Sequence, residues 1–354
     1  MQITSLGSKI MVTDDFSKDL ESILKDYNPN AIFVLVDENT KAKCWPIVKA
    51  ARGLDNAKLL QLIGGEENKS IENTVKIWDF LSKNGADRKS LFINLGGGLI
   101  GDMGGFAAAS FKRGIDFINI PTTLLAQVDA SIGGKLGINF NHLKNEIGFF
   151  KTPKFVLINS EFLKTLDFEN LLSGFAEMIK HSLIYSLDHW NKIKLLDLHQ
   201  LDLTAFTKLI AKSIFIKNDF VKTDFTENNI RKGLNFGHTF GHAFESLLID
   251  QKRPVLHGKA VAFGMICELF LSHRKLGFDQ MVMTDIVNII KKLYGKIEFK
   301  ESDFEFILDF MTHDKKNQNQ MINFTLLKEI GTVEINNHCN LNELKEAFKF
   351  FVEL

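Results

Sequence analysis

The sequence predicts an α/β domain with a mostly parallel sheet, followed by an all-α domain. Sixteen of the 25 glycines and four of the five prolines precede residue 160, so the composition changes there. Before that point short apolar runs alternate with helical patterns, and after it the apolar spacing is helical almost throughout. At 354 residues the chain exceeds what one hydrophobic core usually serves. We therefore expect two domains, 1–159 and 160–354.

Four short apolar runs are the expected strands of the first domain: 31–36, 58–63, 91–95 and 117–120. Ile71, Val75, Trp78 and Leu81 have helical spacing between the second and third runs. Repetition of strand, helix and strand implies a sheet covered by helices on both faces. In the second domain, the spacing predicts helices around 172–183, 206–221 and 261–270.

Charge and cysteine content restrict the partners and the compartment. Lysine plus arginine equals aspartate plus glutamate at 43 each, so no global field recruits nucleic acid or an anionic membrane. The start of the chain lacks the pattern of a secretory signal, and no window reaches the length of a spanning helix. Cys44, Cys267 and Cys339 are far apart, which fits reduced thiols. We expect a cytoplasmic protein that binds neither nucleic acid nor membrane.

A glycine-rich segment follows the third expected strand. Gly96, Gly98 and Gly101 satisfy the GxGxxG pattern between this strand and a helix whose first turns are expected at 103–109. Glycine lets the backbone approach a pyrophosphate closely, and a helix amino terminus offers N–H groups and partial positive charge. This context favours a dinucleotide site. A tight turn with small-residue packing is the alternative.

An acidic residue is expected near the ribose of such a dinucleotide. The usual spacing of about 20 residues leads to Asp116. The glycines do not follow the first strand, however, and an earlier strand ends at Asp37, where a ribose or adenine could lie. Asp37 is the better candidate. Alternatively, Asp37 and Asn39 only form a turn before the next helix.

Histidines in the second domain suit a divalent metal. His238 and His242 are four residues apart, at helical spacing, and His257 follows nearby. Glu177 offers a carboxylate on another helix, and His181 lies four residues after it. One Glu and two His leave a fourth position open, which is typical of catalytic rather than structural zinc. The alternative is that His238 and His242 lie on the polar side of an amphipathic helix.

Together with further motifs, these segments resemble the 3-dehydroquinate synthase family of sugar phosphate cyclases, in order over most of the chain. The motifs are 65–70, 96–102, 113–114, 121–131, 133–135, 144–145, 173–180, Lys217, Arg231, 235–242, 257–258 and 314–317. The resemblance implies a nucleotide-binding domain, a helical domain, one NAD, one zinc or cobalt ion, and a homodimer.

The resemblance also implies roles for single residues. The implied metal ligands are Glu177, His238 and His257, so that His242 neighbours the substrate and His181 is only a rival on spacing. The implied NAD contacts are Asp37, Asn39, Glu66, Lys69, Gly98, Leu99, Ile100, Gly101, Asp102, Thr122, Thr123, Lys135, Lys144, Phe162 and Thr165. The implied substrate contacts are Asp129, Lys135, Asn145, Lys180, Lys217, Arg231, Asn235, His242, Lys315 or Lys316, and Arg113 reaching across the dimer. Taken singly, each lysine or arginine would more often be a solvated surface charge.

The substrate that the resemblance implies is 3-deoxy-D-arabino-heptulosonate 7-phosphate, converted to 3-dehydroquinate and phosphate in the shikimate pathway. The implied steps are transient oxidation by NAD, phosphate elimination, re-reduction, ring opening and an internal aldol reaction. NAD is regenerated, so the enzyme would be a lyase. Its expected catalytic residues are Lys135, Lys180, Lys217, Asn235 and His242, with Arg231 clamping the substrate carboxylate.

Three segments depart from the family pattern. Residues 165–170 lack its proline and its Arg-Glu pair, which puts the cofactor contacts there in doubt. Lys259 follows Gly258 where the family has a glutamate, which reverses a charge close to the site. The segment 247–256 is longer than usual, and we interpret it as a surface loop insertion.

Three other functions remain as alternatives. A related cyclase would act on another sugar phosphate, such as sedoheptulose 7-phosphate, but Asn235, His242 and Lys144-Asn145 argue against it. A metal-dependent polyol dehydrogenase would accumulate NADH. A non-catalytic protein would keep NAD and metal only for stability, and the full set of basic substrate contacts argues against that.

Overall fold

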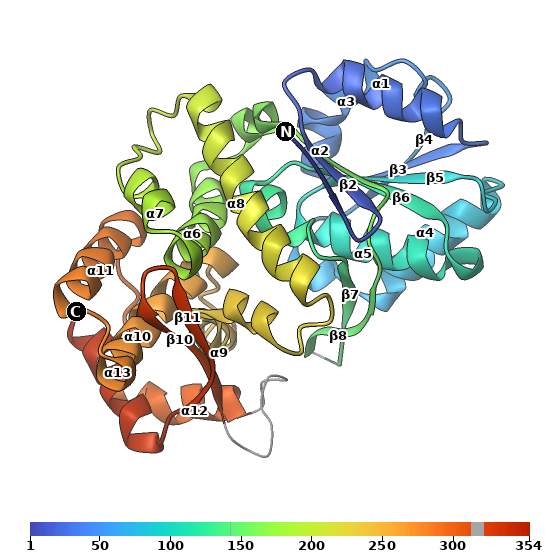
Figure 1. The fold of residues 1–354 in the computed structure, drawn as a ribbon. Coiled ribbons are helices and arrows are strands. Elements are labelled where there is room, and N and C mark those ends of the chain that lie inside the picture. The colour runs from blue at the N-terminus through green and yellow to red at the C-terminus, as the bar shows by residue number, and fades with distance from the viewer. Residues whose placement is uncertain (142, 313–321) are drawn as a thin grey trace. The chain divides into compact units, whose positions relative to one another are not determined.

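The computed structural model describes residues 1–141, 143–312 and 322–354, which form two compact units (Figure 1). Unit 1 comprises Met1–Asp167 and Asp202–Asn218, and unit 2 comprises Phe168–Leu201 and Asp219–Leu354. Helix α8 (Leu203–Thr223) begins in unit 1 and ends in unit 2. The division into domains at residue 159 stays a prediction.

Unit 1 is built on a seven-stranded sheet in the order β1-β2-β9-β6-β5-β3-β4. The strands are β1 (Gln2–Ser5), β2 (Ser8–Val12), β3 (Ile32–Asp37), β4 (Lys58–Leu62), β5 (Leu91–Gly96), β6 (Asp116–Pro121) and β9 (Phe155–Ile158). All neighbours pair in parallel except the hairpin of β1 and β2. The four predicted strands are confirmed as β3, β4, β5 and β6, whereas β1, β2 and β9 were not predicted.

Helices cover both faces of this sheet. The core on one face includes α1 (Phe16–Tyr27) and α3 (Trp45–Lys49), and the core on the other includes α4 (Ile71–Lys83) and α5 (Gly98–Ser110). Along β3, Val34 and Val36 belong to the first core, while Phe33 and Leu35 belong to the second. The strand therefore reads as a continuous apolar run. The predicted parallel sheet with two covered faces is confirmed.

The connections that follow β3 and β5 leave the sheet on opposite faces. The two strands are parallel neighbours. After β3 the chain continues through α2 (Glu38–Lys43) to α3 on one face, and after β5 it continues into α5 on the other. Open α/β sheets bind ligands where adjacent strands send their connections to opposite faces. Asp37 and the glycine segment both lie at this point.

A separate hairpin of β7 (Lys135–Phe140) and β8 (Leu143–Phe150) also belongs to unit 1. Every residue of β8 is exposed, including Leu143, Ile147, Phe149 and Phe150. The short helical turns of the unit are η1 (Glu66–Asn68), η2 (Phe111–Arg113), the π-helical η3 (Ala126–Ala130) and η4 (Ser160–Thr165). An exposed apolar strand with an open edge is a surface on which another chain can pair.

Unit 2 is mostly helical. Its helical elements are α6 (Phe168–Tyr185), α7 (Leu187–Ile193), η5 (Ile230–Asn235), α9 (His238–Asp250), α10 (His257–Leu276), α11 (Gln280–Tyr294), η6 (Glu301–Asp303), α12 (Phe304–Thr312) and α13 (Leu341–Glu353). The predicted helices are confirmed as α6, α8 and α10. The unit also contains an antiparallel hairpin of β10 (Asn323–Glu329) and β11 (Thr332–His338), which was not predicted.

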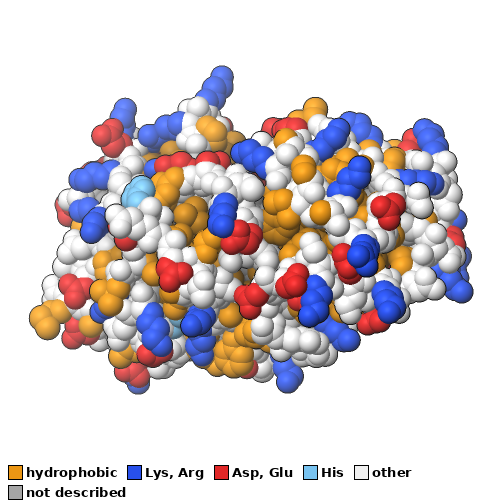
Figure 2. All heavy atoms as spheres, turned by 90° about the horizontal axis from the view of Figure 1, so that it is seen from above, with side chains coloured by type: hydrophobic (Ala, Val, Ile, Leu, Met, Phe, Trp, Pro, Cys, Tyr) orange, Lys and Arg blue, Asp and Glu red, His pale blue; other side chains and the backbone are white. Residues whose placement is uncertain are grey.

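Helix α10 is the centre of unit 2. It contacts α6, α9, α11, α13 and β10, and its side chains are buried on all sides from Ala260 to Leu269. A helix that is apolar all round is typical of a core position. No helix among the described residues is long and apolar enough to cross a membrane. Acidic and basic side chains are interspersed on the face seen in Figure 2, as their equal numbers lead one to expect.

Candidate active site

The glycine segment of unit 1 is the start of a helix and not a loop before one. Helix α5 begins at Gly98, with Gly97 as its N-cap, five residues earlier than the first turn predicted at Met103. The first backbone bond of the helix joins the N–H of Gly101 to the carbonyl of Gly97. The N–H groups of Gly98, Leu99 and Ile100 precede that bond, so they have no acceptor within the helix. They can therefore bind an anion.

A small, partly open hollow lies over this helix start. Its lining comes from the glycines, Asp102, Pro121 and Ser131. The N–H of the buried Thr122 donates to the carbonyl of Gly96 at 3.1 Å. A Cβ at Gly97 would lie 3.1 Å from Thr123, whereas one at Gly101 would have no atom within 4 Å. The structure thus brings together the predicted contacts 98–102 and 122–123.

At the end of β3, Asp37 caps helix α2. Its Oδ1 accepts the backbone N–H of Thr40 at 2.7 Å and the hydroxyl of Thr40 at 2.9 Å. The hydroxyl of Thr40 in turn accepts the N–H of Asp37 at 2.9 Å. This local turn is the alternative that the sequence left open, and it satisfies the Oδ1 atom without a ligand. The ribose contact of Asp37 stays a prediction, as does that of the exposed Asn39.

Lys69 joins predicted site residues from distant motifs. Its side chain is 4% exposed, and its Nζ lies 2.7 Å from Asp102 Oδ2 and also donates to Asn145 Oδ1. Burial alone would lower the pKa of Lys69. The carboxylates of Asp102 and Glu66 outweigh burial and hold this pKa above its ordinary value, so Lys69 stays charged.

Asn139 connects this cluster to Glu66, and no sequence motif pointed to it. Its Nδ2 donates to Glu66 Oε1 at 3.1 Å, and its Oδ1 accepts the N–H of Asn145 at 2.9 Å. Asn145 has a positive φ of 52°. Asn139, on the paired strand β7, therefore holds the backbone of Asn145 in an uncommon conformation.

The ion pair of Lys217 and Asp129 also lies within unit 1. Lys217 Nζ is 2.7 Å from Asp129 Oδ1, and Lys217 is 7% exposed. Asp129 belongs to the π-helical turn η3, and such turns are frequent at functional sites. Arg113, Lys135 and Lys144 are exposed.

The ring of Phe162 packs in the core of unit 1, with its centroid 5.2 Å from that of Phe16. It is 1% exposed, so a contact with a cofactor would have to use its backbone. The hydroxyl of Thr165 donates to the carbonyl of Phe162 at 2.7 Å.

Glu177 of α6 is the buried carboxylate of unit 2. It is fully buried and forms an ion pair with Lys180, which is 1% exposed. Its Oε1 lies 3.6 Å from His238 Nε2 and 3.7 Å from His257 Nε2. Among the described residues, none donates a hydrogen bond to this oxygen. Two imidazole nitrogens from different helices thus converge on one buried oxygen.

The second ring nitrogen of each histidine faces an acceptor. His238 Nδ1 lies 3.2 Å from the carbonyl of Phe236, and His257 Nδ1 lies 3.4 Å from Glu245 Oε2. An acceptor at Nδ1 fixes the proton there and leaves Nε2 as a metal ligand. Glu245 is a further site residue that spacing alone did not reveal.

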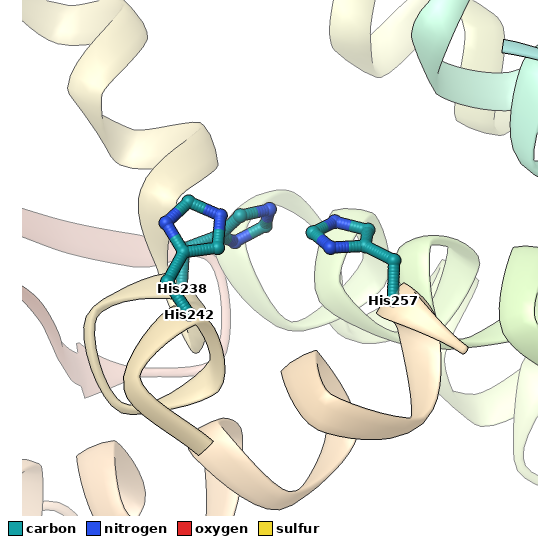
Figure 3. A group of neighbouring side chains, drawn as sticks. All are labelled: His238, His242 and His257. Carbon is teal, nitrogen blue, oxygen red and sulfur yellow. The ribbon is translucent and has the colours of Figure 1, made fainter. Parts of the chain in front are cut away.

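His242 lies in the same cluster. One ligand nitrogen each of His238, His242 and His257 can be chosen within 4.8 Å of one another, and the three rings face a common space in Figure 3. His181 is fully buried on α6, and one of its ring nitrogens lies within 4.8 Å of a Glu177 oxygen. His242 and His181 both lie close to the implied ligands, so distance alone does not exclude either of them from the metal site.

Arg231 and Asn235 lie around η5 of unit 2. Arg231 is 2% exposed and donates to the carbonyl of Phe225. Asp224 holds this loop, because its carboxylate accepts the N–H groups of Asn228, Asn229 and Arg231 at 2.7–3.2 Å. Burial alone would raise the pKa of Asp224. The three hydrogen bonds outweigh burial and hold this pKa below its ordinary value.

Asn235 Nδ2 donates to Glu227 Oε1 at 2.9 Å. The sequence analysis did not single out Asp224 or Glu227. Lys315 and Lys316 lie outside the described residues.

The loop interpretation of 247–256 was wrong in its first part. Residues 247–250 form the last turn of α9, where Leu247 and Leu248 are buried in the core. Their apolar side chains continue the face of the helix. Only 251–256 connect α9 to α10, and Lys259 lies in the first turn of α10, half-buried.

Known proteins are similar to this chain in sequence and in fold. Residues 59–173 match the family described as 3-dehydroquinate synthase N-terminal, and residues 174–317 match 3-dehydroquinate synthase C-terminal. A curated 3-dehydroquinate synthase from Parabacteroides distasonis is 46% identical over 345 residues, which are 98% of each chain.

Two solved structures have a similar fold. One is 2-deoxy-scyllo-inosose synthase complexed with carbaglucose-6-phosphate, NAD⁺ and Co²⁺, at a TM-score of 0.88 and 22% identity, covering 99% of this chain and 100% of that one. The other is 2-epi-5-epi-valiolone synthase from Streptomyces hygroscopicus with NAD⁺ and Zn²⁺ bound, at 0.84 and 20%, covering 99% and 98%.

By its fold, the chain is in the structural class of these two synthases. The two matched family regions, together with the 46% identity to a curated relative over 98% of the chain, then identify its family within this class. The chain belongs to the 3-dehydroquinate synthase family.

Replacing Lys69 by Met removes the cation beside Asp102 and keeps the aliphatic stem. We expect Lys69→Met to lower the free energy of unfolding by about 1–3 kcal/mol at pH 7, because a partly buried carboxylate loses its partner. Burial already raises the pKa of Asp102, and the cation of Lys69 acts against this shift, so its removal raises that pKa further. A carboxyl whose pKa is raised by folding destabilises the folded state above its unfolded pKa, so the loss shrinks as the pH falls from 7 toward 4.

Thermal unfolding at pH 7 and pH 4.5 measures this loss. The matched control is Lys154→Met, which breaks the exposed pair with Asp116 at 3.6 Å. It is expected to cost less than about 0.5 kcal/mol at either pH. Equal losses in both variants, or a loss from Lys69→Met that does not change with pH, would contradict the prediction.

Proposed function

We propose that this chain converts 3-deoxy-D-arabino-heptulosonate 7-phosphate to 3-dehydroquinate and phosphate, with NAD and a zinc or cobalt ion. The observation that carries the proposal is the convergence of His238 Nε2 and His257 Nε2 on Glu177 Oε1 in a member of this family. The curated relative from Parabacteroides distasonis carries the name 3-dehydroquinate synthase.

The donor set of unit 2 fits a divalent metal. Ligand atoms at about 2.0–2.1 Å from a tetrahedral zinc lie about 3.3 Å from one another. The separations of 3.6 and 3.7 Å at Glu177 are close to that value. His257 keeps 31% of its side chain exposed, so one side of the cluster can admit a substrate. His181 is as fully buried as Glu177, so burial does not decide between it and the implied ligands.

The start of α5 and the end of β3 in unit 1 suit NAD. The N–H groups of Gly98, Leu99 and Ile100 have no acceptor within α5 and suit the pyrophosphate. Asp37 lies at the end of β3, at the same edge of the sheet, where the ribose of a dinucleotide usually lies. The similar solved structures contain NAD⁺ together with Co²⁺ or Zn²⁺.

When bound, NAD takes and returns a hydride, and the metal acts as a Lewis acid on the substrate hydroxyls. The chain itself supplies charge and orientation. The guanidinium of Arg231 is fixed by Phe225 and suits the substrate carboxylate. The ion pairs with Asp129 and Glu177 hold Lys217 and Lys180 in place, so that these side chains orient oxygens of the substrate.

The remaining roles concern the leaving phosphate and the protons. Asn145 is held by Lys69 and Asn139, and with Lys135 and Arg113 it would bind the departing phosphate. Lys144 would lie on the cofactor side, and Lys315 or Lys316 would add charge to the phosphate site. His242 stands beside the implied metal ligands and would move a proton of a substrate hydroxyl, with Asn235 orienting the ring.

The chain is further proposed to act as a cytoplasmic homodimer. The exposed apolar strand β8 offers an open edge and four large apolar side chains for a second copy. The exposed Arg113 would then reach the partner's site. Cys44, Cys267 and Cys339 are free, which suits a reducing compartment, and recovery of the protein from a periplasmic or membrane fraction would contradict this location.

Purified protein supplied with NAD and zinc or cobalt is expected to release one phosphate per heptulosonate consumed. Absorbance at the NADH wavelength is expected to stay flat in the steady state, because the hydride is returned within the cycle. Phosphate release and 3-dehydroquinate formation measure the reaction directly. Lasting NADH without phosphate would mark a polyol dehydrogenase, and activity only with sedoheptulose 7-phosphate would mark another cyclase.

His257→Ala is expected to lose the metal and the activity while it keeps its fold, because one of three protein ligands is gone. His242→Ala is the matched control on the neighbouring ring, and it is expected to keep the metal but lose activity by about 10²-fold or more. Metal content after gel filtration and circular dichroism test both variants. Metal lost from His242→Ala and kept by His257→Ala would reverse the assignment.

Ile147→Lys is expected to weaken the dimer, because it places a charge on the apolar face of β8. Sedimentation velocity is expected to find the parent at about twice the chain mass of 40.1 kDa, and the variant shifted toward the monomer. Ile63→Lys places the same charge at another exposed site of unit 1 and is expected to stay dimeric. A dimer unaffected by Ile147→Lys, or a monomeric parent, would refute this interface.

A further inference from the structure

Helix α9 begins with a metal-ligand candidate and lacks a cap of its own. Its first residue is His238, and its N-cap is Gly237, which has no side chain to accept the first N–H groups. Gly237 has a φ of +82°, a conformation that favours glycine. Helix ends fray when their first N–H groups find no acceptor. A ligand at such a position would be poorly fixed.

Glu268 of α10 supplies the missing acceptor. Its Oε2 accepts the N–H of Gly237 at 2.6 Å, and its Oε1 accepts those of Thr239 and Phe240 at 3.0 and 3.3 Å. Glu268 is fully buried. Charge-assisted bonds at a helix amino terminus are strong where water is excluded, because the partial positive charge of the terminus meets a full negative charge.

The same helix α10 carries the other histidine ligand candidate. His257 is its first residue, and Glu268 follows three turns later. Glycines bring the two helices into close contact: a Cβ at Gly241 would lie 3.0 Å from Val261 Cα, and a Cβ at Gly264 would overlap the carbonyl of Gly237. The start of α9 is therefore fixed to the body of α10 by both backbone packing and the carboxylate.

We propose that Glu268 is a positioning residue that fixes His238 relative to His257 and Glu177 by capping α9. The proposal rests on the metal site of the proposed function. Metal ligands need a geometry fixed within about half an ångström, and changes in the groups that support ligands typically cost 10–100-fold in metal affinity. Glu268 acts through the backbone of residues 237–240 and touches neither substrate nor cofactor in this role.

The test is cobalt binding by Glu268→Gln. Glutamine has nearly the same volume, but it offers one acceptor oxygen and turns an NH₂ group toward backbone N–H donors. We expect cobalt affinity to fall about 10–100-fold and the visible d–d absorption of bound cobalt to change, because His238 is displaced. Titration of the metal-free protein with Co²⁺ measures both, without the enzymatic reaction.

Asp303→Asn is the matched control. Asp303 is 9% exposed, accepts the N–H of Lys300 at 2.7 Å, and lies near the far end of α9. This variant is expected to lower the thermal midpoint of the metal-free protein, with the cobalt affinity and spectrum unchanged. A variant that only loses stability would change its thermal midpoint but not its cobalt affinity or spectrum. Comparison of Glu268→Gln with Asp303→Asn therefore separates an effect on ligand position from a loss of stability.

Parental cobalt affinity and spectrum in folded Glu268→Gln would overturn the proposal. If that variant does not fold, Glu268→Asp keeps the charge on a side chain one methylene shorter, and its affinity is expected to lie between those of Glu268→Gln and the parent. Parental binding by Glu268→Asp would then overturn the proposal as well. A parent protein that binds no cobalt would instead refute the metal site itself.

Discussion

The buried carboxylate of Glu177 is the constraint on which unit 2 depends. A charged carboxylate without water is costly unless cations and donors surround it. Here Lys180 pairs with it from the same helix, and His238 and His257 turn their Nε2 atoms toward its Oε1 from two other helices. Three helices are therefore oriented around one oxygen atom, and a divalent cation there would complete its neutralisation.

In unit 1 the buried charge is positive, and it too is surrounded by partners that neutralise it. The buried ammonium of Lys69 is neutralised by Asp102 at the start of α5 and held by Asn145 of the hairpin. This joins the glycine-rich start of the helix to the strand that carries Lys144. In both units a buried charge and its partners fix the positions of residues that are far apart in the sequence.

Much of this could be predicted, because periodicity and motif spacing are local. The runs that became β3, β5 and β6 are apolar on both faces, and GxGxxG marked the start of α5. Polar residues interrupt the apolar residues of β1 and β2, whereas β9 is a short apolar run like the predicted ones that the sequence analysis did not use. Glu268, Glu245 and Asn139 act across tertiary contacts, so no local pattern could identify them.

The central claim is that Glu177, His238 and His257 hold one metal ion. A crystal structure of the zinc-loaded protein with an anomalous difference map at the zinc edge tests it most directly. The account predicts one peak about 2.0–2.2 Å from Glu177 Oε1, His238 Nε2 and His257 Nε2. A peak bound by His238 and His242 without Glu177, or none in this cluster, would contradict it.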